Sequence, residues 1–289
     1  MKKNVLMIVN PISGDMDKTE MIAIAKEFSE TRNYNFISYE TSGDDDAANI
    51  QDLFNTHKPE RIIIAGGDGT IKMVAESLET QDVIFGILPA GSANGLSVDL
   101  NLPAAIEENL EIAFSNKFMN IDMICINGKK SLHLSDLGLN AQLVKNYENS
   151  NTRGMLGYAL QAITTLSEQE EPFTATIEAN GQTIECVARM VVIANSQKYG
   201  TGVVINPNGI MNDGKFEIVL LKNLDLIVFG KIISGNMPLD SDDVEIISAE
   251  KATIKTTVPV SFQIDGEYIG LEDKLDIYIL PGQMKVTIP

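Results

Sequence analysis

The chain has 289 residues, of which 44% are hydrophobic, and its formal net charge at pH 7 is −18. This length and hydrophobic content support one large domain or two ordinary ones with real cores, and they exclude a disordered chain. The negative charge argues against nucleic acid as a partner, because phosphate binding is driven largely by cations.

Cysteine use and the lack of long apolar stretches predict a compartment. Cys125 and Cys186 lie within apolar stretches, as buried thiols of a reducing compartment do, so we expect a cytoplasmic protein. The first apolar run, Val5 to Val9, is too short for a secretory signal, and no stretch approaches the roughly 20 apolar residues of a membrane span. We expect a soluble protein with peripheral membrane contact at most, and the sequence leaves a homo-oligomer open.

The first 120 residues alternate between strand and helix patterns. Apolar runs predict strands at residues 5–9, 35–39, 61–65 and 83–88, and amphipathic segments predict helices at 17–31, 44–55 and 70–78. Buried strands separated by helices form a parallel sheet with helices on both faces. We therefore expect an α/β domain at residues 1–120, with its ligand site beyond the carboxyl ends of the strands.

The remaining residues, 121–289, predict a β-rich second domain. Apolar and alternating runs predict strands at 121–126, 131–134, 174–178, 182–195, 216–221, 252–256, 260–264, 274–279 and 284–288. Asn-Gly, Asp-Gly and Pro-Gly turns separate them. One helical pattern, at about 155–168, interrupts the strands. We expect a β-sandwich-like domain packed so that the active site lies between the two domains.

The segment Gly66-Gly67-Asp68-Gly69-Thr70 joins a predicted buried strand to a predicted helix. Successive glycines let the backbone turn tightly and present N–H groups to a phosphate, and the helix N-terminus adds a favourable field for that anion. Asp68 would then point into the site. The alternative is structural, namely a strand-to-helix turn that needs glycine and an aspartate cap.

The same pentapeptide marks the superfamily of diacylglycerol kinases, sphingosine and ceramide kinases, NAD kinases and phosphofructokinases. Asn10 to Gly14 resembles the opening motif of the lipid kinases, and Pro89 to Asn94 resembles their Pro-x-Gly-[Thr/Ser]-x-Asn loop. Thr41 resembles a further nucleotide contact of the family, after the second strand. The chain is thus similar to the diacylglycerol kinase catalytic-domain family of bacterial lipid kinases, which are related to the sphingosine kinases.

This resemblance implies an ATP-dependent lipid kinase that uses Mg²⁺, with nucleotide on the first domain and the lipid acceptor largely on the second. The implied contacts to ATP are Asn10, Pro11, Ser13, Gly14, Thr41, Gly66, Gly67, Asp68, Gly69, Thr70, Gly91, Ser92 and Asn94. Asp68 is also the residue that the resemblance places next to the nucleotide's magnesium.

Three segments of the second half carry further implied roles. Asp265-Gly266-Glu267 resembles the family's Asp-Gly-Glu, whose glutamate deprotonates the acceptor hydroxyl, so Asp68 and Glu267 are the implied catalytic residues. A hairpin turn would explain the same three letters. Asn212-Asp213-Gly214 resembles a loop that binds a structural magnesium, with Ile210, Asp213 and Lys215 as ligands. Asp122 resembles an aspartate that links water to the metal.

The chain departs from the family pattern at three positions. Lys72 and Met73 stand where Asn and Glu normally follow the pentapeptide, and Gly95 stands where diacylglycerol kinases have aspartate. These differences leave the acceptor open between diacylglycerol, a sphingoid base and another lipid. Two other functions also stay open: an NAD kinase or other kinase with a soluble acceptor, and a non-catalytic nucleotide- or lipid-binding module of the same fold.

Overall fold

The structure is a computed structural model that describes residues 2–15, 17–79, 81–92, 94–138, 141, 171–198, 203–223 and 242–289. It divides into two compact units: unit 1 comprises Met1–Ile121 and Gly282–Pro289, and unit 2 comprises Asp122–Pro281. The expected division into 1–120 and 121–289 therefore needs a correction at its C-terminal end. The last eight residues return to unit 1, because Val286 pairs in parallel with Phe85.

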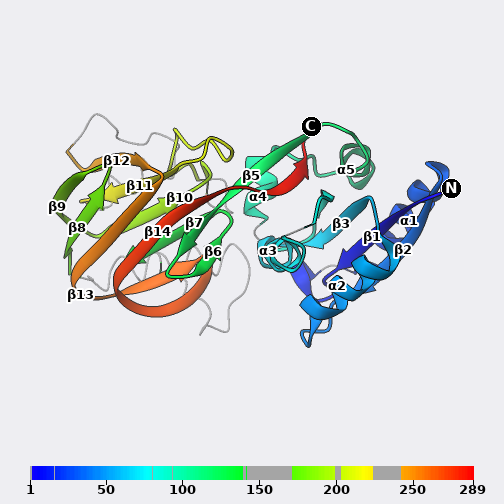
Figure 1. Cartoon of the computed structure of the whole chain (residues 1–289), viewed down its shortest axis with the longest axis horizontal. Coiled ribbons are helices and arrows are strands. Elements are labelled where there is room, and N and C mark those ends of the chain that lie inside the picture. The colour runs from blue at the N-terminus through cyan, green and yellow to red at the C-terminus, as the bar shows by residue number, and fades with distance from the viewer. Residues whose placement is uncertain are drawn as a thin grey trace. The chain divides into compact units, whose positions relative to one another are not determined.

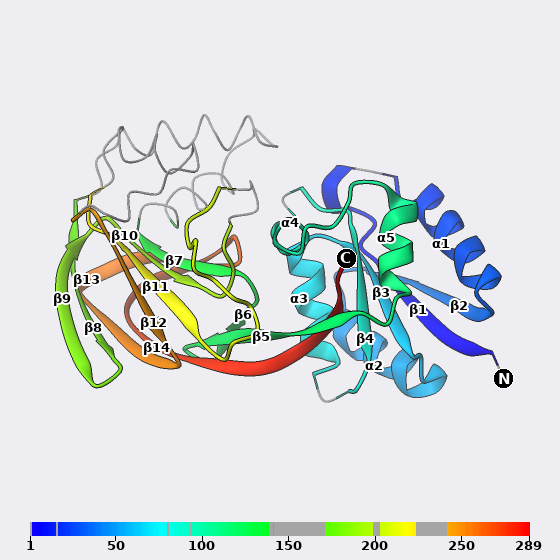
Figure 2. The same ribbon diagram turned by 90° about the horizontal axis from the view of Figure 1, so that it is seen from above.

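Unit 1 is built on a parallel sheet with the strand order β4-β3-β1-β2 (Figures 1 and 2). Its strands are β1 (Lys3–Val9), β2 (Tyr34–Glu40), β3 (Arg61–Gly66) and β4 (Ile84–Pro89). Its helices are the 3-10 helix η1 (Ser13–Asp15), α1 (Thr19–Thr31), α2 (Asp46–His57), α3 (Asp68–Ser77), α4 (Gly95–Asp99) and α5 (Ile106–Ala113). The predicted parallel α/β architecture is confirmed.

Helices cover both faces of this sheet, which explains why β1 and β3 read as continuous apolar runs. On one face, α1 and α5 pack together, and the rings of Phe28 and Phe114 lie 5.3 Å apart. Helices α2 and α3 lie on the other face (Figure 1). The sequence periodicity predicted α1, α2 and α3, whereas it did not predict the short helices α4 and α5.

Unit 2 is a β-rich unit, as Figure 2 shows from above. Its strands are the end of β5 (Phe118–Ile126), β6 (Lys129–Ser131), β7 (Leu134–Gly138), β8 (Phe173–Ala179), β9 (Gln182–Ala188), β10 (Met190–Ala194), β11 (Phe216–Leu221), β12 (Val244–Ala249), β13 (Lys251–Ile264) and most of β14 (Glu267–Thr287). The β-sandwich-like prediction is confirmed. The helical pattern expected at 155–168 lies outside the described residues.

The long strand β13 builds the β-rich unit because its two ends pair with different strands. Its residues 252–256 pair with β8, and its residues 262–264 pair with β7. Between these segments the register on β14 shifts, from Lys255 to Val260. Pro259 lies at this shift, where its missing N–H removes no regular ladder bond. The apolar inner faces share one core that includes Ile177, Ile193 and Phe262.

Several predicted strand boundaries in this half are wrong. The expected strand 182–195 is two strands, β9 and β10, and the two pairs of strands expected within 252–264 and 274–288 are the single strands β13 and β14. Strand β12 was not predicted. The expected Pro-Gly turn at Pro281-Gly282 lies inside β14, where Gly282 has a φ of 62° and the chain continues as a strand. Proline and glycine therefore mark a local distortion here.

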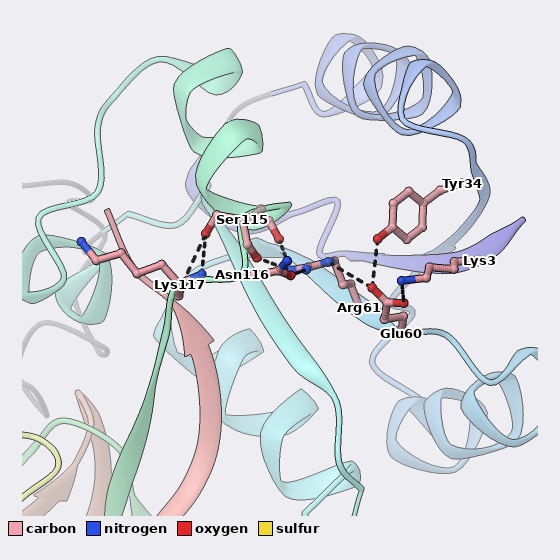
Figure 3. Close-up of polar contacts among 8 residues, drawn as sticks. Lys3, Tyr34, Glu60, Arg61, Ser115, Asn116 and Lys117 are labelled. Atoms are coloured by element: carbon pink, nitrogen blue, oxygen red, sulfur yellow. Dashed lines mark hydrogen bonds and ion pairs between the residues drawn. The ribbon is translucent and has the colours of Figure 1, made fainter.

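At the amino end of β3, Arg61 is a buried cation with 1% exposure (Figure 3). Its Nη1 donates to the carbonyl of Ser115 at 2.6 Å and to that of Ala113 at 3.2 Å, and its Nη2 donates to Asn116 Oδ1 at 2.6 Å. A cation at the C-terminus of α5 satisfies the last carbonyls of the helix and complements its dipole. Arg61 thereby fixes the turn that leads from α5 into β5.

Candidate active site

The loops that follow the four parallel strands of unit 1 bring together the residues that the sequence singles out. We call this the carboxyl edge, and it consists of residues 10–14 after β1, 41–43 after β2, 66–70 after β3 and 90–92 with 94 after β4. All the nucleotide contacts implied by the resemblance lie on these loops. A parallel sheet places its ligand at this edge.

Side-chain hydrogen bonds join the loop after β1 to the two glycine loops. Asn10 Nδ2 donates to Thr70 Oγ1 at 3.1 Å, and Ser13 Oγ donates to the carbonyl of Ala90 at 2.8 Å. Gly14 has a φ of 63°, and a Cβ atom there would lie 2.7 Å from the same Ala90 carbonyl oxygen. Only glycine fits this conformation and this contact. Thus three loops that are distant in the sequence form one connected group.

Gly67 and Gly91 let two of these loops touch backbone to backbone. A Cβ atom on Gly91 would overlap with the Cα of Gly67, and one on Gly67 would lie 3.1 Å from the Cα of Gly91. Gly66 needs its missing Cβ for a different reason, because that atom would lie 2.6 Å from Thr70 Oγ1. By contrast, a Cβ on Gly69 would meet nothing within 4 Å, so this part of the turn is open.

Asp68 connects the same two loops through its carboxylate. Oδ2 accepts a hydrogen bond from the backbone N–H of Gly95 at 2.6 Å, and Oδ1 accepts one from Leu96 N–H at 3.0 Å. These are the first N–H groups of α4, so Asp68 caps that helix from a neighbouring loop. The structural alternative, an aspartate cap, is therefore correct in part, although the capped helix is α4 and not α3.

Asn94 closes its own loop and begins α4. It has a φ of 42°, and its Oδ1 accepts from Gly91 N–H at 2.7 Å while its Nδ2 donates to the Gly91 carbonyl at 2.8 Å. Ser92 and Pro11 are exposed at the same edge, and Thr41 is half-buried. At Gly95 the contact to Asp68 comes from the backbone, so the loss of an aspartate side chain at this position leaves that contact intact.

Lys18 is a residue at this edge that the sequence did not reveal. It is only 4% exposed, and its Nζ donates to the carbonyl of Ser13 at 2.5 Å. Lys18 stands at the start of α1, where the helix dipole disfavours a cation. That unusual position was the signal available in the sequence. Lys72 is half-buried on α3, so it is not the fully solvated helix lysine that a surface position would give.

In unit 2, Asp265 organises the Asp-Gly-Glu turn. Its carboxylate accepts hydrogen bonds from Ser131 Oγ and from the N–H groups of Leu132 and His133, each at 2.9 Å. Asp265 and Gly266 both have positive φ values, of 51° and 86°, as a tight hairpin requires. The hairpin alternative is thus correct for the backbone. Glu267 is exposed and begins β14 directly after the turn.

The loop at 210–215, also in unit 2, is held by Asp122. Asp122 Oδ2 accepts from the N–H of Gly214 at 2.7 Å, and the N–H of Asp122 donates to the carbonyl of Met211 at 2.8 Å. Asp213 is exposed, and its Oδ1 accepts from the N–H of Lys215 at 3.0 Å. Hydrogen bonds from the backbone to Asp122 and to one oxygen of Asp213 therefore hold the loop in shape.

The carboxylate oxygens of Asp68 and of Asp213 fit magnesium only when other oxygens complete the coordination shell of the ion. In the described part of the chain, no group of three or more His, Cys, Asp or Glu side chains could hold a metal ion. Magnesium commonly takes one or two carboxylates together with waters or substrate phosphates. Each Asp68 oxygen accepts one backbone hydrogen bond. A carboxylate oxygen can accept more than one hydrogen bond, so a contact to the metal through water fits. At the second place, backbone carbonyls of the 210–215 loop would have to bind the ion together with Asp213.

The sequence matches two described families. Residues 4–126 match the diacylglycerol kinase catalytic domain, and residues 136–288 match the YegS C-terminal NAD kinase beta sandwich-like domain. A protein of Synechocystis without an assigned function is 27% identical over 98% of this chain and 70% of that protein. A protein of Salmonella arizonae named probable lipid kinase YegS is 25% identical over 80% of this chain and 78% of its own length.

A solved structure also resembles the chain. The crystal structure of a diacylglycerol kinase from Bacillus anthracis aligns with a TM-score of 0.78 and 23% identity, covering 99% of this chain and 97% of that one. At this identity the likeness establishes the fold. Among the residues that the structure describes, no helix has the length and apolar character that crossing a membrane requires.

Proposed function

The chain belongs to the diacylglycerol kinase catalytic-domain family, and from this premise we propose that it transfers the γ-phosphate of ATP to a hydroxyl group of a lipid, such as diacylglycerol or a sphingoid base. The observation that carries the proposal is the connection of the glycine loops at the carboxyl edge. Gly67 and Gly91 touch through their backbones, and Asp68 bridges the same loops. Because Gly67 and Gly91 have no side chains, a phosphate chain could approach the backbone N–H groups of these loops.

Phosphoryl transfer asks the protein mainly for positioning and charge neutralisation. ATP would supply the phosphoryl group, and Mg²⁺ would neutralise its charge. Asp68 would hold the nucleotide's metal, and Ile210, Asp213 and Lys215 would hold a structural ion. Asn10 and Ser13 keep the loop after β1 against the glycine loops. The N–H groups at the start of α3 offer an anion a favourable field.

Glu267 is the proposed general base, which accepts the proton of the acceptor hydroxyl. The turn that carries it is fixed, because Asp265 receives three hydrogen bonds at 2.9 Å and Gln263 Oε1 accepts from the N–H of Gly266 at 2.7 Å. A general base must be held within hydrogen-bond reach of the proton it takes. Glu267 is an exposed carboxylate next to a turn that is fixed by hydrogen bonds, so it is held in place, as a general base must be.

The test is transfer of label from [γ-³²P]ATP with Mg²⁺ to a lipid extract, to purified diacylglycerol or sphingosine in mixed micelles, and to NAD. We expect label in the organic phase for wild type. Glu267→Gln keeps the shape of the side chain and removes the base, so we expect kcat to fall by about 10² to 10⁴ with ATP affinity within twofold of wild type.

Glu272 supplies the matched control, since it is also a glutamate of β14 and has no assigned role. Glu272→Gln should transfer phosphate at the wild-type rate. Label that appears only in the aqueous phase with NAD would replace the lipid proposal by an NAD kinase. ATP binding without transfer to any acceptor, in wild type and in Glu267→Gln alike, would replace it by a non-catalytic module.

A further inference from the structure

The loop after β2 is held by one carboxylate, that of Asp46. Asp46 Oδ1 accepts from the N–H of Ser42 at 3.0 Å and from Tyr39 Oη at 2.6 Å, while Oδ2 accepts from the N–H of Gly43 at 2.9 Å. Asn49 Nδ2 donates to Tyr39 Oη at 3.0 Å and so fixes the phenol as well. Three residues from β2 and the loop therefore converge on Asp46, and Asn49 of α2 acts through Tyr39.

These contacts favour the charged form of Asp46. Its partial burial raises the pKa, but the hydrogen bonds from Tyr39, Ser42 and Gly43 outweigh that effect and hold the pKa below the usual value of 3.8. Asp46 is also the first residue of α2, where the helix dipole favours an anion. Hydrogen bonds to a charged acceptor are the stronger kind, so the loop is well fixed at neutral pH.

The hydrogen bonds to Asp46 limit what the loop after β2 can bind. The N–H groups of Ser42 and Gly43, which would otherwise suit a phosphate, are already donated to Asp46. The loop carries the negative charges of Asp44, Asp45 and Asp46, which repel an anion. The loop therefore suits a neutral part of a ligand, and the half-buried Thr41 is the residue that the resemblance assigns to the nucleotide.

The position of the loop agrees with this chemistry. In the sheet order β4-β3-β1-β2, strand β1 separates β2 from β3. Neighbouring strands lie about 4.8 Å apart, so the ends of β2 and β3 are roughly 10 Å from each other. A nucleotide whose phosphates lie at the Gly66 to Thr70 turn can reach the end of β2 with its nucleoside part. The N–H of Thr41 donates to the Val9 carbonyl at 2.8 Å, which continues the ladder to the loop itself.

We propose that Asp46 is a positioning residue that holds the Thr41–Gly43 loop for the ribose or base of the nucleotide, and not for its phosphates. This proposal rests on the proposed function, since it presumes that the carboxyl edge binds ATP. It assigns different parts of the ligand to different loops: phosphates to the glycine turns after β3 and β4, and the nucleoside to the loop after β2.

The experiment measures binding of ATP, ADP and adenosine to the full chain by isothermal titration calorimetry. In Asp46→Asn, one of the oxygens that accepts a backbone N–H becomes an amide donor, so the loop loses its fixed form. We expect the Kd for adenosine and for ATP to rise by the same factor, about tenfold, so that their ratio stays as in wild type. Tyr39→Phe should raise both Kd values by about threefold. In the kinase assay, KM for ATP should rise while kcat stays within twofold.

Asp52→Asn is the matched control, because it removes the same charge from an exposed position of the same helix. It should leave all three Kd values unchanged. A larger loss for ATP than for adenosine in Asp46→Asn would overturn the proposal and move the loop to the phosphates. A lower Tm with unchanged Kd values would reduce Asp46 to a structural role. If wild type binds ATP and transfers phosphate in either case, the proposed function stands; if wild type binds no nucleotide, the proposed function fails as well.

Discussion

The two ends of strand β3 differ in the kind of polar group that they carry: a charged side chain at one end and backbone groups at the other. At the amino end, Arg61 is a buried cation whose guanidinium reaches two backbone carbonyls and the side chain of Asn116 (Figure 3). At the carboxyl end, Gly66 and Gly67 have no side chain, and the backbone groups face neighbouring loops. A long side chain that fills its own site leaves no room for a ligand, whereas the turn at the carboxyl end is open at Gly69.

This difference assigns stability to one end and ligand binding to the other. A buried charge is costly unless its hydrogen bonds are complete, so the Arg61 end is sensitive to any loss of a partner. The glycine end depends on the close approach of Gly67 and Gly91, where a small displacement misplaces the groups that contact a nucleotide. Substitutions at the two ends should therefore separate stability from activity.

The largest effect is expected from Gly91→Ala. The new Cβ would overlap with the Cα of Gly67, and since both atoms belong to backbone, the two loops must move apart. A misplacement of about 1 Å can lower a rate by 10²-fold, which corresponds to about 2.7 kcal/mol. We expect kcat/KM for ATP to fall by at least about 10²-fold with a Tm within about 3 °C of wild type. Steady-state kinetics and thermal unfolding measure the two.

Gly86→Ala is the control of equal size under helix α5. Its Cβ would lie 2.5 Å from the Cβ of Ala113, so it pushes the helix away from the sheet and not the two loops from each other. The expected result is the reverse one, a lower Tm with kcat/KM per folded molecule close to wild type. If Gly91→Ala lowered the Tm as much as Gly86→Ala, the carboxyl edge would also be a structural element.

The fold of unit 1 follows from its sequence because each element has a strong period. Val5 to Val9 and Ile62 to Gly66 are fully apolar within buried strands, and the helix between residues 19 and 31 repeats its apolar residues at helical spacing. The helices α4 and α5 escaped prediction since they have only five and eight residues. In unit 2, β13 and β14 change pairing partners along their length, and no local pattern reports a pairing partner.

The candidate site was predictable as a set of loops but not as a set of contacts. Turn glycines after buried strands identified Gly66 to Thr70 and Gly91, because this placement is visible in the sequence. The donors to Asp68, the N–H groups of Gly95 and Leu96, lie 27 and 28 residues away along the chain. Such a pairing depends on tertiary structure alone. By contrast, the partners of Lys18 and Asp46 lie only three to seven residues away along the chain.

The next effect in size concerns the amino end. Arg61→Met keeps much of the side-chain volume and removes the charged donors of three hydrogen bonds. The carbonyls of Ala113 and Ser115 lose their partner in a buried place, so we expect a loss of about 3 kcal/mol and a Tm lower by about 6 to 12 °C. The Kd for ATP should stay within twofold of wild type, by calorimetry at a temperature where the variant is folded.

Arg32→Met serves as the control for loss of an arginine. Arg32 pairs with Glu111 on the surface, with side-chain exposures of 40% and 60%, and such exposed pairs contribute about 1 kcal/mol or less. Its Tm should be close to that of wild type. An ATP affinity that fell with Arg61→Met and not with Arg32→Met would mean that the two ends of β3 are coupled, which contradicts the separation argued above.

The smallest effect tests the same separation by pH. Burial raises the pKa of Glu60, but hydrogen bonds from Lys3 and Tyr34 outweigh it and hold the pKa below its ordinary 4.5. A carboxyl with a depressed folded-state pKa stabilises the fold above its unfolded pKa and loses this contribution as the pH falls through the folded one. Glu60→Gln should therefore cost less than about 1 kcal/mol at pH 7, because the pair with Lys3 is partly exposed.

The difference in Tm between wild type and Glu60→Gln should be complete at about pH 6 to 7. It should shrink towards zero as the pH falls through the depressed pKa of Glu60, where Glu60 also becomes neutral. Thermal unfolding across this pH range measures it, with ATP binding at pH 7 as the second readout. A difference that grew on acidification would mean that Glu60 is protonated in the fold. A change in ATP affinity at pH 7 would mean instead that the charges around Arg61 act on the carboxyl edge, although β3 separates the two.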